Sequence, residues 1–294
     1  MGRNKDKISV FKTKNYKGVC KMKVKFLLIN VYVLFAIGIL ATSGYAKIDP
    51  NTCVGMWLFD EGKGDTAKDL SGNKYDGTLL NSPKWIDGKF GKALNFEGVD
   101  DCVSIPNKSA LLEQQFTQMT MMAYVYPTAF GGGTYGHTII SRTDGDGWSL
   151  RINNGLLLAD LRLTGGNVTA SIPPTKIAAN TWSHIAVTYD NTKGIILGYI
   201  NGNNIGELKG SGNIKNAGNA ATCTFIGTDP ATCKPQGPEF DFTGSIDEVA
   251  MFSVALTEDD IKSISSKGLG VTMGIAPVDA SSKLTTTWAN IKAR

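Results

Sequence analysis

The chain has 294 residues, of which 42% are hydrophobic and 19% charged, with 34 glycines and a formal net charge of +4. This balance excludes an intrinsically disordered chain, which would be poor in aromatic residues and rich in charge, and it excludes a coiled coil. The length suits one large or two small domains, because all-β folds often use more than about 200 residues in a single unit.

The basic excess lies in residues 1–46, which contain nine Lys or Arg and a single acid. An apolar run, FLLINVYVLFAIGIL, ends at residue 40 and is followed by the small residues Gly44 and Ala46. A basic start, an apolar run and small residues at −3 and −1 are typical of a secretory signal peptide. We therefore predict that 1–46 is a signal peptide, with Met22 as the true start. The alternative is an uncleaved membrane anchor, although the run is shorter than the roughly 20 residues that span a bilayer.

Removing this segment leaves 21 basic and 25 acidic residues, so the exported chain would carry a net charge of −4. No cluster of Lys or Arg with aromatic residues remains that could follow a phosphate backbone. We therefore predict a protein that is secreted or held in the cell envelope and that binds no nucleic acid. It would contact a membrane only through an uncleaved leader.

Four cysteines follow the predicted leader: Cys53, Cys102, Cys223 and Cys233. They allow three pairings. The spacing between Cys223 and Cys233 suits a staple across a short loop, which leaves Cys53 to pair with Cys102. A zinc site is the competing interpretation, but the chain lacks a Cys-x2-Cys pair, and disulfides suit an oxidising compartment.

Short runs of alternating apolar and polar residues, separated by Gly, Asn, Asp and Pro, predict β-strands rather than helices. The pair Asn201-Gly202 between two such runs predicts a tight hairpin, since both turn residues need φ > 0. Together the runs predict an all-β, two-sheet antiparallel sandwich. The predicted strands are Val54–Asp60, Ala93–Phe96, Cys102–Ile105, Thr117–Tyr126, Thr138–Ser141, Trp148–Ile152, Leu156–Leu163, Val168–Ile172, Trp182–Tyr189, Ile195–Asn201, Asn204–Glu207, Thr222–Ile226 and Gly244–Phe252.

A single short helix is predicted near the C-terminus. Thr257 is a suitable N-cap, and Asp260 stands three positions on, where its carboxylate can complete a capping box. Ile261 and Ile264 form an apolar stripe, and Gly268 can end the helix. We therefore place one domain at 47–268 and a tail of unassigned role at 269–294, which could be a linker, a last strand or an attachment segment.

Several stretches resemble a known family. The opening of LamG-like jelly-roll domains, which belong to the concanavalin A-like lectin/glucanase superfamily, resembles two stretches of this chain. These are residues 54–79, VGMWLFDEGKGDTAKDLSGNKYDGTL, and residues 85–103. Three later stretches resemble the same family: NTWSHIAVTYD (180–190), GYINGNNIG (198–206) and GSIDEVAMFSVALTEDDIKSI (244–264). The resemblance implies a jelly-roll fold over nearly all of the predicted domain, while activity is decided separately by the site.

The resemblance also implies a structural calcium ion. In the family, the aspartate of the D-x-S-G loop and that of the G-x-I-D-E-V strand commonly lie near one. The matching residues here are Asp69, with Asn73 as a carbonyl donor, and Asp247. The alternative is that Asp69 caps its own turn and that Asp247 pairs with neighbouring backbone.

Long loops on sandwiches often carry binding sites. Asp144, Asp146 and Trp148 in RTDGDGW could hold a sugar through hydroxyl–carboxylate hydrogen bonds and stacking on the indole. Tyr135 is a further candidate from the preceding loop. The structural alternative is an ordinary hairpin turn in which Trp148 enters the core.

The sequence contains no E-x-D-x-E array, which would place two carboxyl groups on one face of a strand as a retaining glycosidase needs. Asp247 and Glu248 are adjacent, so alternation should point them to opposite faces. The chain also lacks a G-x-S-x-G elbow and an H-E-x-x-H motif. We therefore predict no enzyme, but an exported LamG-like recognition or adhesion module for glycan or a cell-surface protein. The alternatives are a structural or envelope-attachment protein with no small ligand and, less favoured, a polysaccharide hydrolase.

Overall fold

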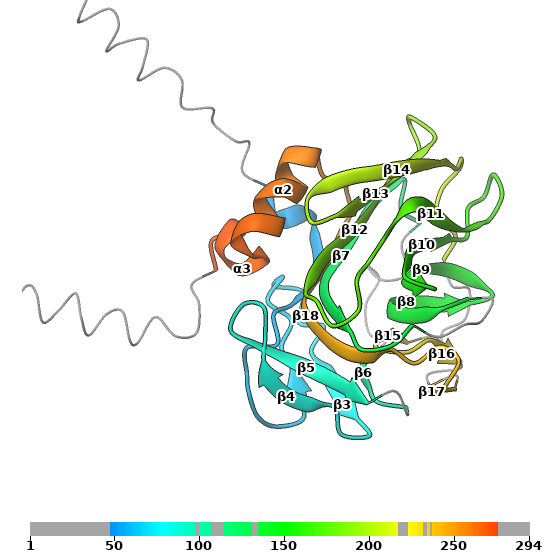
Figure 1. Cartoon of the computed structure of the whole chain (residues 1–294). Helices are drawn as coiled ribbons and strands as arrows, with labels where there is room; N and C mark the ends of the chain where they lie inside the picture. Colours follow the sequence, from blue (N-terminus) through cyan, green and yellow to red (C-terminus); the bar gives the residue numbers. More distant parts are fainter. Residues whose placement is uncertain are drawn as a thin grey trace, which may run out of the picture. The chain divides into compact units, whose positions relative to one another are not determined.

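The computed structural model describes residues 48–97, 100–106, 115–130, 135–216, 223–231, 234–235 and 237–275. These residues form two antiparallel sheets packed face to face, with two short α-helices against the outer face of one of them (Figure 1). The predicted all-β, two-sheet sandwich is therefore confirmed. The predicted leader, residues 1–46, and the tail beyond residue 275 lie outside the described residues.

The first sheet has the strand order β14-β13-β12-β7-β18-β5-β4, and β1 also pairs with β18. Its strands are β1 (Cys53–Trp57), β4 (Lys84–Asp87), β5 (Lys92–Glu97), β7 (Gln118–Pro127), β12 (Ser183–Asp190), β13 (Ile195–Ile200), β14 (Asn203–Lys209) and β18 (Thr243–Phe252). A 3-10 turn, η1 (Pro50–Thr52), precedes β1.

The second sheet has the order β11-β10-β9-β8-β15-β6-β3-β2. Its strands are β2 (Thr66–Ala67), β3 (Gly77–Leu80), β6 (Cys102–Ile105), β8 (His137–Asp144), β9 (Asp146–Asn153), β10 (Leu156–Leu161), β11 (Val168–Lys176) and β15 (Thr224–Ile226). The strands β16 (Pro230–Ala231) and β17 (Lys234–Pro235) form a separate small hairpin.

The main core fills the space between the sheets. On β9, Trp148, Leu150 and Ile152 point into this core, whereas Ser149 and Arg151 alternate with them and point outward. The same alternation runs along β12, where Ile185, Val187 and Tyr189 point into the main core. The sequence period of two therefore decides which side chains are free to form a site on the outer faces.

A second apolar cluster covers the outer face of the first sheet. Met122 of β7 and Phe252 of β18 pack there against Ile261 and Ile264 of helix α2 (Glu258–Lys267). As a result β7 and β18 are buried on both faces along most of their length. The two central strands are thus the most enclosed part of the sheet.

Two local predictions are confirmed. Thr257 caps α2 with a complete capping box to Asp260, and the helix ends at Gly268 with φ 85°. Asn201 and Gly202 join β13 to β14 with φ values of 50° and 79°, as a tight hairpin requires.

The predicted domain boundary at 268 does not coincide with the end of the packed structure. A second helix, α3 (Leu269–Thr272), follows α2 at once, and Leu269 is fully buried in the outer cluster. The backbone N–H groups of Leu269 and Gly270 bond to Glu248, a contact between distant parts of the chain. Among the described residues, no helix has both the length and the apolar character needed to cross a membrane.

The predicted pairing of Cys53 with Cys102 is wrong, because both are free thiols. Cys53 starts β1 in the first sheet and lies in the outer cluster, while Cys102 starts β6 in the second sheet and packs against Phe225. Burial raises the pKa of each thiol to about 12. Cys233 lies outside the described residues, so its pairing with Cys223 stays a prediction.

We predict that Thr257→Ala lowers the free energy of unfolding by about 1 kcal/mol, because it removes the hydroxyl that accepts the Asp260 N–H. Urea unfolding measures this loss. Ser266→Ala, on the exposed last turn of the same helix, is the matched control and should change stability by less than about 0.5 kcal/mol. Equal losses in both variants would show that the cap is not responsible.

Candidate functional site

The outer face of the second sheet carries a buried polar network centred on Arg151 of β9. Its Nη2 donates to Oδ2 of Asp229 at 2.8 Å, and its Nε donates to Oγ of Ser149 at 2.6 Å. Hydroxyl groups of Ser141 and Thr143, both on β8, donate to Oδ1 of Asp229. Arg151 and Asp229 are 2% and 4% exposed. The hydrogen bonds to Asp229 and Ser149 therefore fix the guanidinium inside the protein.

An aromatic pair lies over this guanidinium. The rings of Tyr135 and Phe240 are stacked, with centroids 5.9 Å apart and planes inclined by 26°. The guanidinium carbon of Arg151 lies 6.0 Å from the Tyr135 ring centroid and 5.5 Å from that of Phe240. Tyr135 is 44% exposed, whereas Phe240 is buried. Nη1 of Arg151 is buried without a hydrogen-bond partner.

The charges of this network balance. Asp160 of β10 lies 3.7 Å from Nη2 of Arg151, forms an ion pair with Arg162 at 3.2 Å, and accepts a hydrogen bond from Thr169. With Asp229, the network contains two arginines and two aspartates. It therefore presents hydrogen-bonding groups beside an aromatic surface without a strong field of either sign.

The structure does not bring the four predicted ligand residues together. Trp148 is 2% exposed in the main core, which corrects its assignment as a ligand contact and follows from strand alternation. Asp146 pairs with Lys215 at 3.2 Å and begins β9, at the end of the β8–β9 hairpin away from Tyr135. The side chain of Asp144 lies outside the described ones. Of the three whose side chains are described, Tyr135 alone joins the Arg151 network.

The predicted calcium residue Asp69 holds its own loop together. Its Oδ1 accepts the N–H groups of Met56 and Ser71 at 3.0 and 2.9 Å, and its Oδ2 accepts the N–H of Tyr75 at 2.9 Å and the Ser71 hydroxyl. Four donors therefore point at this carboxylate. A cation at the same oxygens would face those hydrogens, so Asp69 does not fit as a calcium ligand.

Asn73 likewise serves the loop, because its amide nitrogen donates to the carbonyl groups of residues 53 and 54. Asp247 accepts the N–H of Phe90 at 2.9 Å through Oδ2, while its Oδ1 has no partner. Among the described residues there is no group of three or more His, Cys, Asp or Glu that could hold a metal ion. Calcium binding stays a prediction.

The expectation that Asp247 and Glu248 point to opposite faces is wrong. The register of β18 shifts between Asp247 and Ala250, and Glu248 has φ 47°. Such a β-bulge inserts one extra residue and re-aims a side chain. Ile246 and Val249 point into the main core, and both carboxylates between them lie on the outer side, where Glu248 accepts the N–H groups at the start of α3.

Burial dominates the electrostatics of this pair. It raises the pKa of Asp247 to about 8, against the lowering effect of the Phe90 N–H, and the nearby charge of Glu248 adds to the rise. Burial likewise raises the pKa of Glu248 to about 7, against the two α3 N–H bonds, with a further rise from Asp60. The two adjacent carboxylates of β18 and that of Asp60, which is distant in the chain, therefore act on one another.

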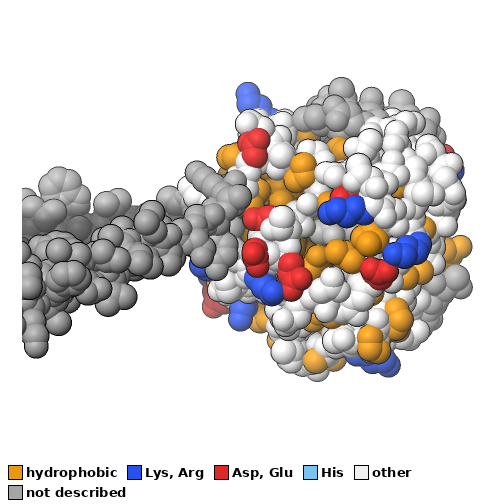
Figure 2. Space-filling model, turned by 90° about the horizontal axis from the view of Figure 1, so that it is seen from above, with side chains coloured by type: hydrophobic (Ala, Val, Ile, Leu, Met, Phe, Trp, Pro, Cys, Tyr) orange, Lys and Arg blue, Asp and Glu red, His pale blue; other side chains and the backbone are white. Residues whose placement is uncertain are grey.

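Basic and acidic side chains are interspersed on the face seen in Figure 2, and no continuous basic stripe crosses its described residues. The two features that stand out are instead local: the aromatic–guanidinium site at Tyr135 and the carboxylates around Glu248. The sequence alone singles out Tyr135 at the first feature, and Asp247 and Glu248 at the second.

A family profile described as concanavalin A-like lectin/glucanases superfamily (Laminin_G_3) matches residues 97–262, more than half of the chain. The chain belongs to this superfamily. The resemblance inferred from the sequence motifs is thereby confirmed.

A segment of 144 residues is 27% identical to botulinum neurotoxin type X from Clostridium botulinum, covering 48% of this chain and 11% of the toxin. The fold is similar to the binding domain of Paraclostridial Mosquitocidal Protein 1, with a TM-score of 0.58 and 17% identity over 74% of this chain and 52% of that one. It is also similar to domain 4 of AbnA, a GH43 extracellular arabinanase from Geobacillus stearothermophilus solved with arabinotriose, with a TM-score of 0.54 and 20% identity over 73% and 98%. At these identities the solved structures show a shared fold.

We predict that Asp69→Asn lowers the free energy of unfolding by about 1–3 kcal/mol, because an amide cannot accept all four hydrogen bonds. The loss should be equal in calcium and in EDTA, as measured by urea unfolding and thermal melting. A melting temperature of the parent protein that rises with the logarithm of free calcium would instead support the calcium site.

We predict that the contribution of Asp247 and Glu248 to stability falls as the pH rises from about 4 to about 8. Both folded-state pKa values, of Asp247 and Glu248, lie above those of the unfolded chain. The folded state therefore holds more protons in this range, and each proton lost destabilises it. Asp247→Asn should reduce the slope of unfolding free energy against pH. The exposed control Asp87→Asn should leave the slope unchanged; an equal slope in all three proteins would contradict the assignment.

Proposed function

We propose that this protein is an exported, non-enzymatic recognition module that binds carbohydrate at the Tyr135 surface, on the outer side of the second sheet. The observation that carries the proposal is the partly exposed ring of Tyr135, stacked on Phe240 beside a buried guanidinium whose Nη1 has no partner. An aromatic face and a small number of fixed polar groups are what a sugar site needs.

The physical roles are distinct. The C–H face of a sugar ring packs on Tyr135, which is already held in place by Phe240 and so loses little freedom on binding. The guanidinium of Arg151, only 2% exposed, lies against both rings and holds them in place by cation–π contact. Because the network beneath is neutral, we expect it to favour uncharged sugars over strongly charged polymers.

The comparisons support this class of ligand. Domain 4 of the arabinanase was solved in complex with arabinotriose. The binding domain of botulinum neurotoxin DC, which has the same fold, was solved with rat synaptotagmin II and, separately, with SialylT. This chain spans about half the length of those toxin binding domains. These similar structures favour a glycan as the ligand of this chain, with a cell-surface protein as the second class of ligand.

Export is part of the proposal, since it rests on the signal-peptide pattern in residues 1–46 and on a staple between Cys223 and Cys233. Both features favour a protein that is secreted or held in the cell envelope. The lack of an E-x-D-x-E array in the sequence favours binding without hydrolysis.

We predict that Tyr135→Ala weakens glycan binding about fivefold or more, because an aromatic contact of about 1 kcal/mol is lost. A glycan array that includes arabinotriose selects the probe, and calorimetric titration measures its dissociation constant for each variant. Tyr126→Ala is the matched control, since Tyr126 pairs with Trp182 on the first sheet, at a ring distance of 5.6 Å. Unchanged affinity in Tyr135→Ala, or equal losses in both variants, would overturn the proposed site.

A further inference from the structure

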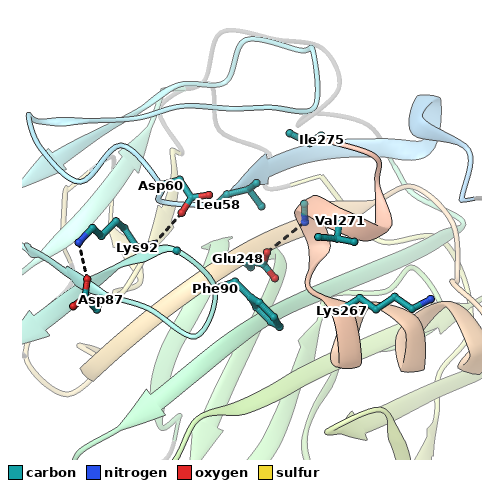
Figure 3. Close-up of a pocket in the computed structure, with 11 residues that line it drawn as sticks. Leu58, Asp60, Asp87, Phe90, Lys92, Glu248, Lys267, Val271 and Ile275 are labelled. Atoms are coloured by element: carbon teal, nitrogen blue, oxygen red, sulfur yellow. Dashed lines mark hydrogen bonds and ion pairs between the residues drawn. The ribbon is translucent and has the colours of Figure 1, made fainter. Parts of the chain in front are cut away.

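A separate cavity of about 410 Å³ lies against the first sheet, away from the Tyr135 surface (Figure 3). One wall is formed by the segment after β1 and another by the segment before β5. The bulge of β18, helix α3 and Ile275, which follows α3, complete the lining. The volume lies within the range of small-molecule pockets. The residues that matter are Asp60, Glu248, Phe90, Leu58, Val271 and Ile275.

The centre of the cavity is acidic. In Figure 3 the carboxyl groups of Asp60 and Glu248 lie in the middle, while the side chains of Lys92 and Lys267 lead away from Glu248 on either side. The ammonium group of Lys92 is paired with Asp87 at 2.6 Å. The positive groups are thus at the rim, and the carboxylates are inside.

The Glu248 carboxylate is fixed but not saturated. Its Oε2 accepts the N–H of Leu269 at 2.7 Å, and its Oε1 accepts that of Gly270 at a longer 3.3 Å. Each carboxylate oxygen can accept about two hydrogen bonds, so acceptor capacity remains on both. The backbone of Glu248 is fixed by the β-bulge and its carboxylate by the N–H groups of α3, so the side chain keeps this orientation.

The rest of the wall is apolar. Leu58, Phe90, Val271 and Ile275 line it. The rings of Phe90 and Tyr124 pack edge to face, with centroids 5.2 Å apart. Such a wall suits a short hydrocarbon chain. We propose that the cavity binds a protonated primary amine carried on an apolar stem, the chemistry of a lysine side chain of a partner protein.

This inference goes beyond glycan recognition, since it assigns a different ligand to a different sheet. A hard cation such as calcium is a poorer match, because it takes six to eight oxygen ligands and the described residues offer no group of three metal-binding side chains. A neutral polyol would not use the separation of inner carboxylates from outer lysines. An ammonium group on a stem uses both the charge and the apolar wall.

The test compares n-hexylammonium with 1-hexanol, which have the same stem and differ in charge. Titration of the whole protein, followed by calorimetry and by backbone amide NMR, should give saturable binding of the amine at least about tenfold tighter than that of the alcohol. Shifts should centre on Gly270 and Val271. Equal affinity for both probes, or shifts elsewhere, would overturn the proposal.

Two variants locate the site. Glu248→Gln keeps an acceptor for α3 but removes the charge, and should lower amine affinity at least about tenfold. Should that variant fold poorly, Val271→Lys serves instead, because Val271 is 56% exposed and a lysine there would bring a competing ammonium. Val271→Leu is its matched control and should bind as the parent does. An unchanged amine affinity in Val271→Lys would contradict the proposal.

Discussion

The β-bulge at Glu248, in the central strand of the first sheet, is the constraint on which much of the molecule depends. Strand β18 pairs with β1, β7 and β5 and is buried on both faces. In such a strand, one extra residue cannot be absorbed at an edge, so it is held by all three neighbours. A non-glycine residue with φ 47° persists only when its surroundings determine it.

The consequence is a pair of adjacent carboxylates on one side of the sheet, each holding a different segment. Asp247 fixes the turn before β5 through the N–H of Phe90, and Glu248 fixes the start of α3. Burying two carboxylates side by side is costly unless they are hydrogen-bonded or protonated. Here both compensations operate, which is why the same feature organises the loops around the cavity and makes the local electrostatics sensitive to pH.

The sequence predicts those features that depend on neighbouring residues. The capping box of Thr257, the turn at Asn201-Gly202 and the inward direction of alternate strand residues are local, and the structure agrees with them. The bulge could not be read in this way, since its φ is imposed by strands distant in sequence. The stack of Tyr135 on Phe240 joins residues about a hundred positions apart, so the sequence suggests the tyrosine but not its partner. The predicted pairing of Cys53 with Cys102 was wrong for the same reason. It rested only on these two cysteines remaining once Cys223 and Cys233 were paired, whereas their strands belong to different sheets.

The two proposed sites differ in charge because their buried charged side chains are stabilised in different ways. Around Arg151, oppositely charged side chains pair with one another and leave a neutral surface. Around Glu248, like charges meet, and backbone N–H groups rather than arginines hold them. Since the sites lie on outer faces of sheets that pack about 10 Å apart, a single sugar or amine cannot touch both. Occupation of one should therefore leave the other unaffected, and their binding free energies should add. A partner that engages both must be large enough to wrap the edge of the sandwich, which favours a glycosylated or lysine-bearing macromolecule over a free metabolite.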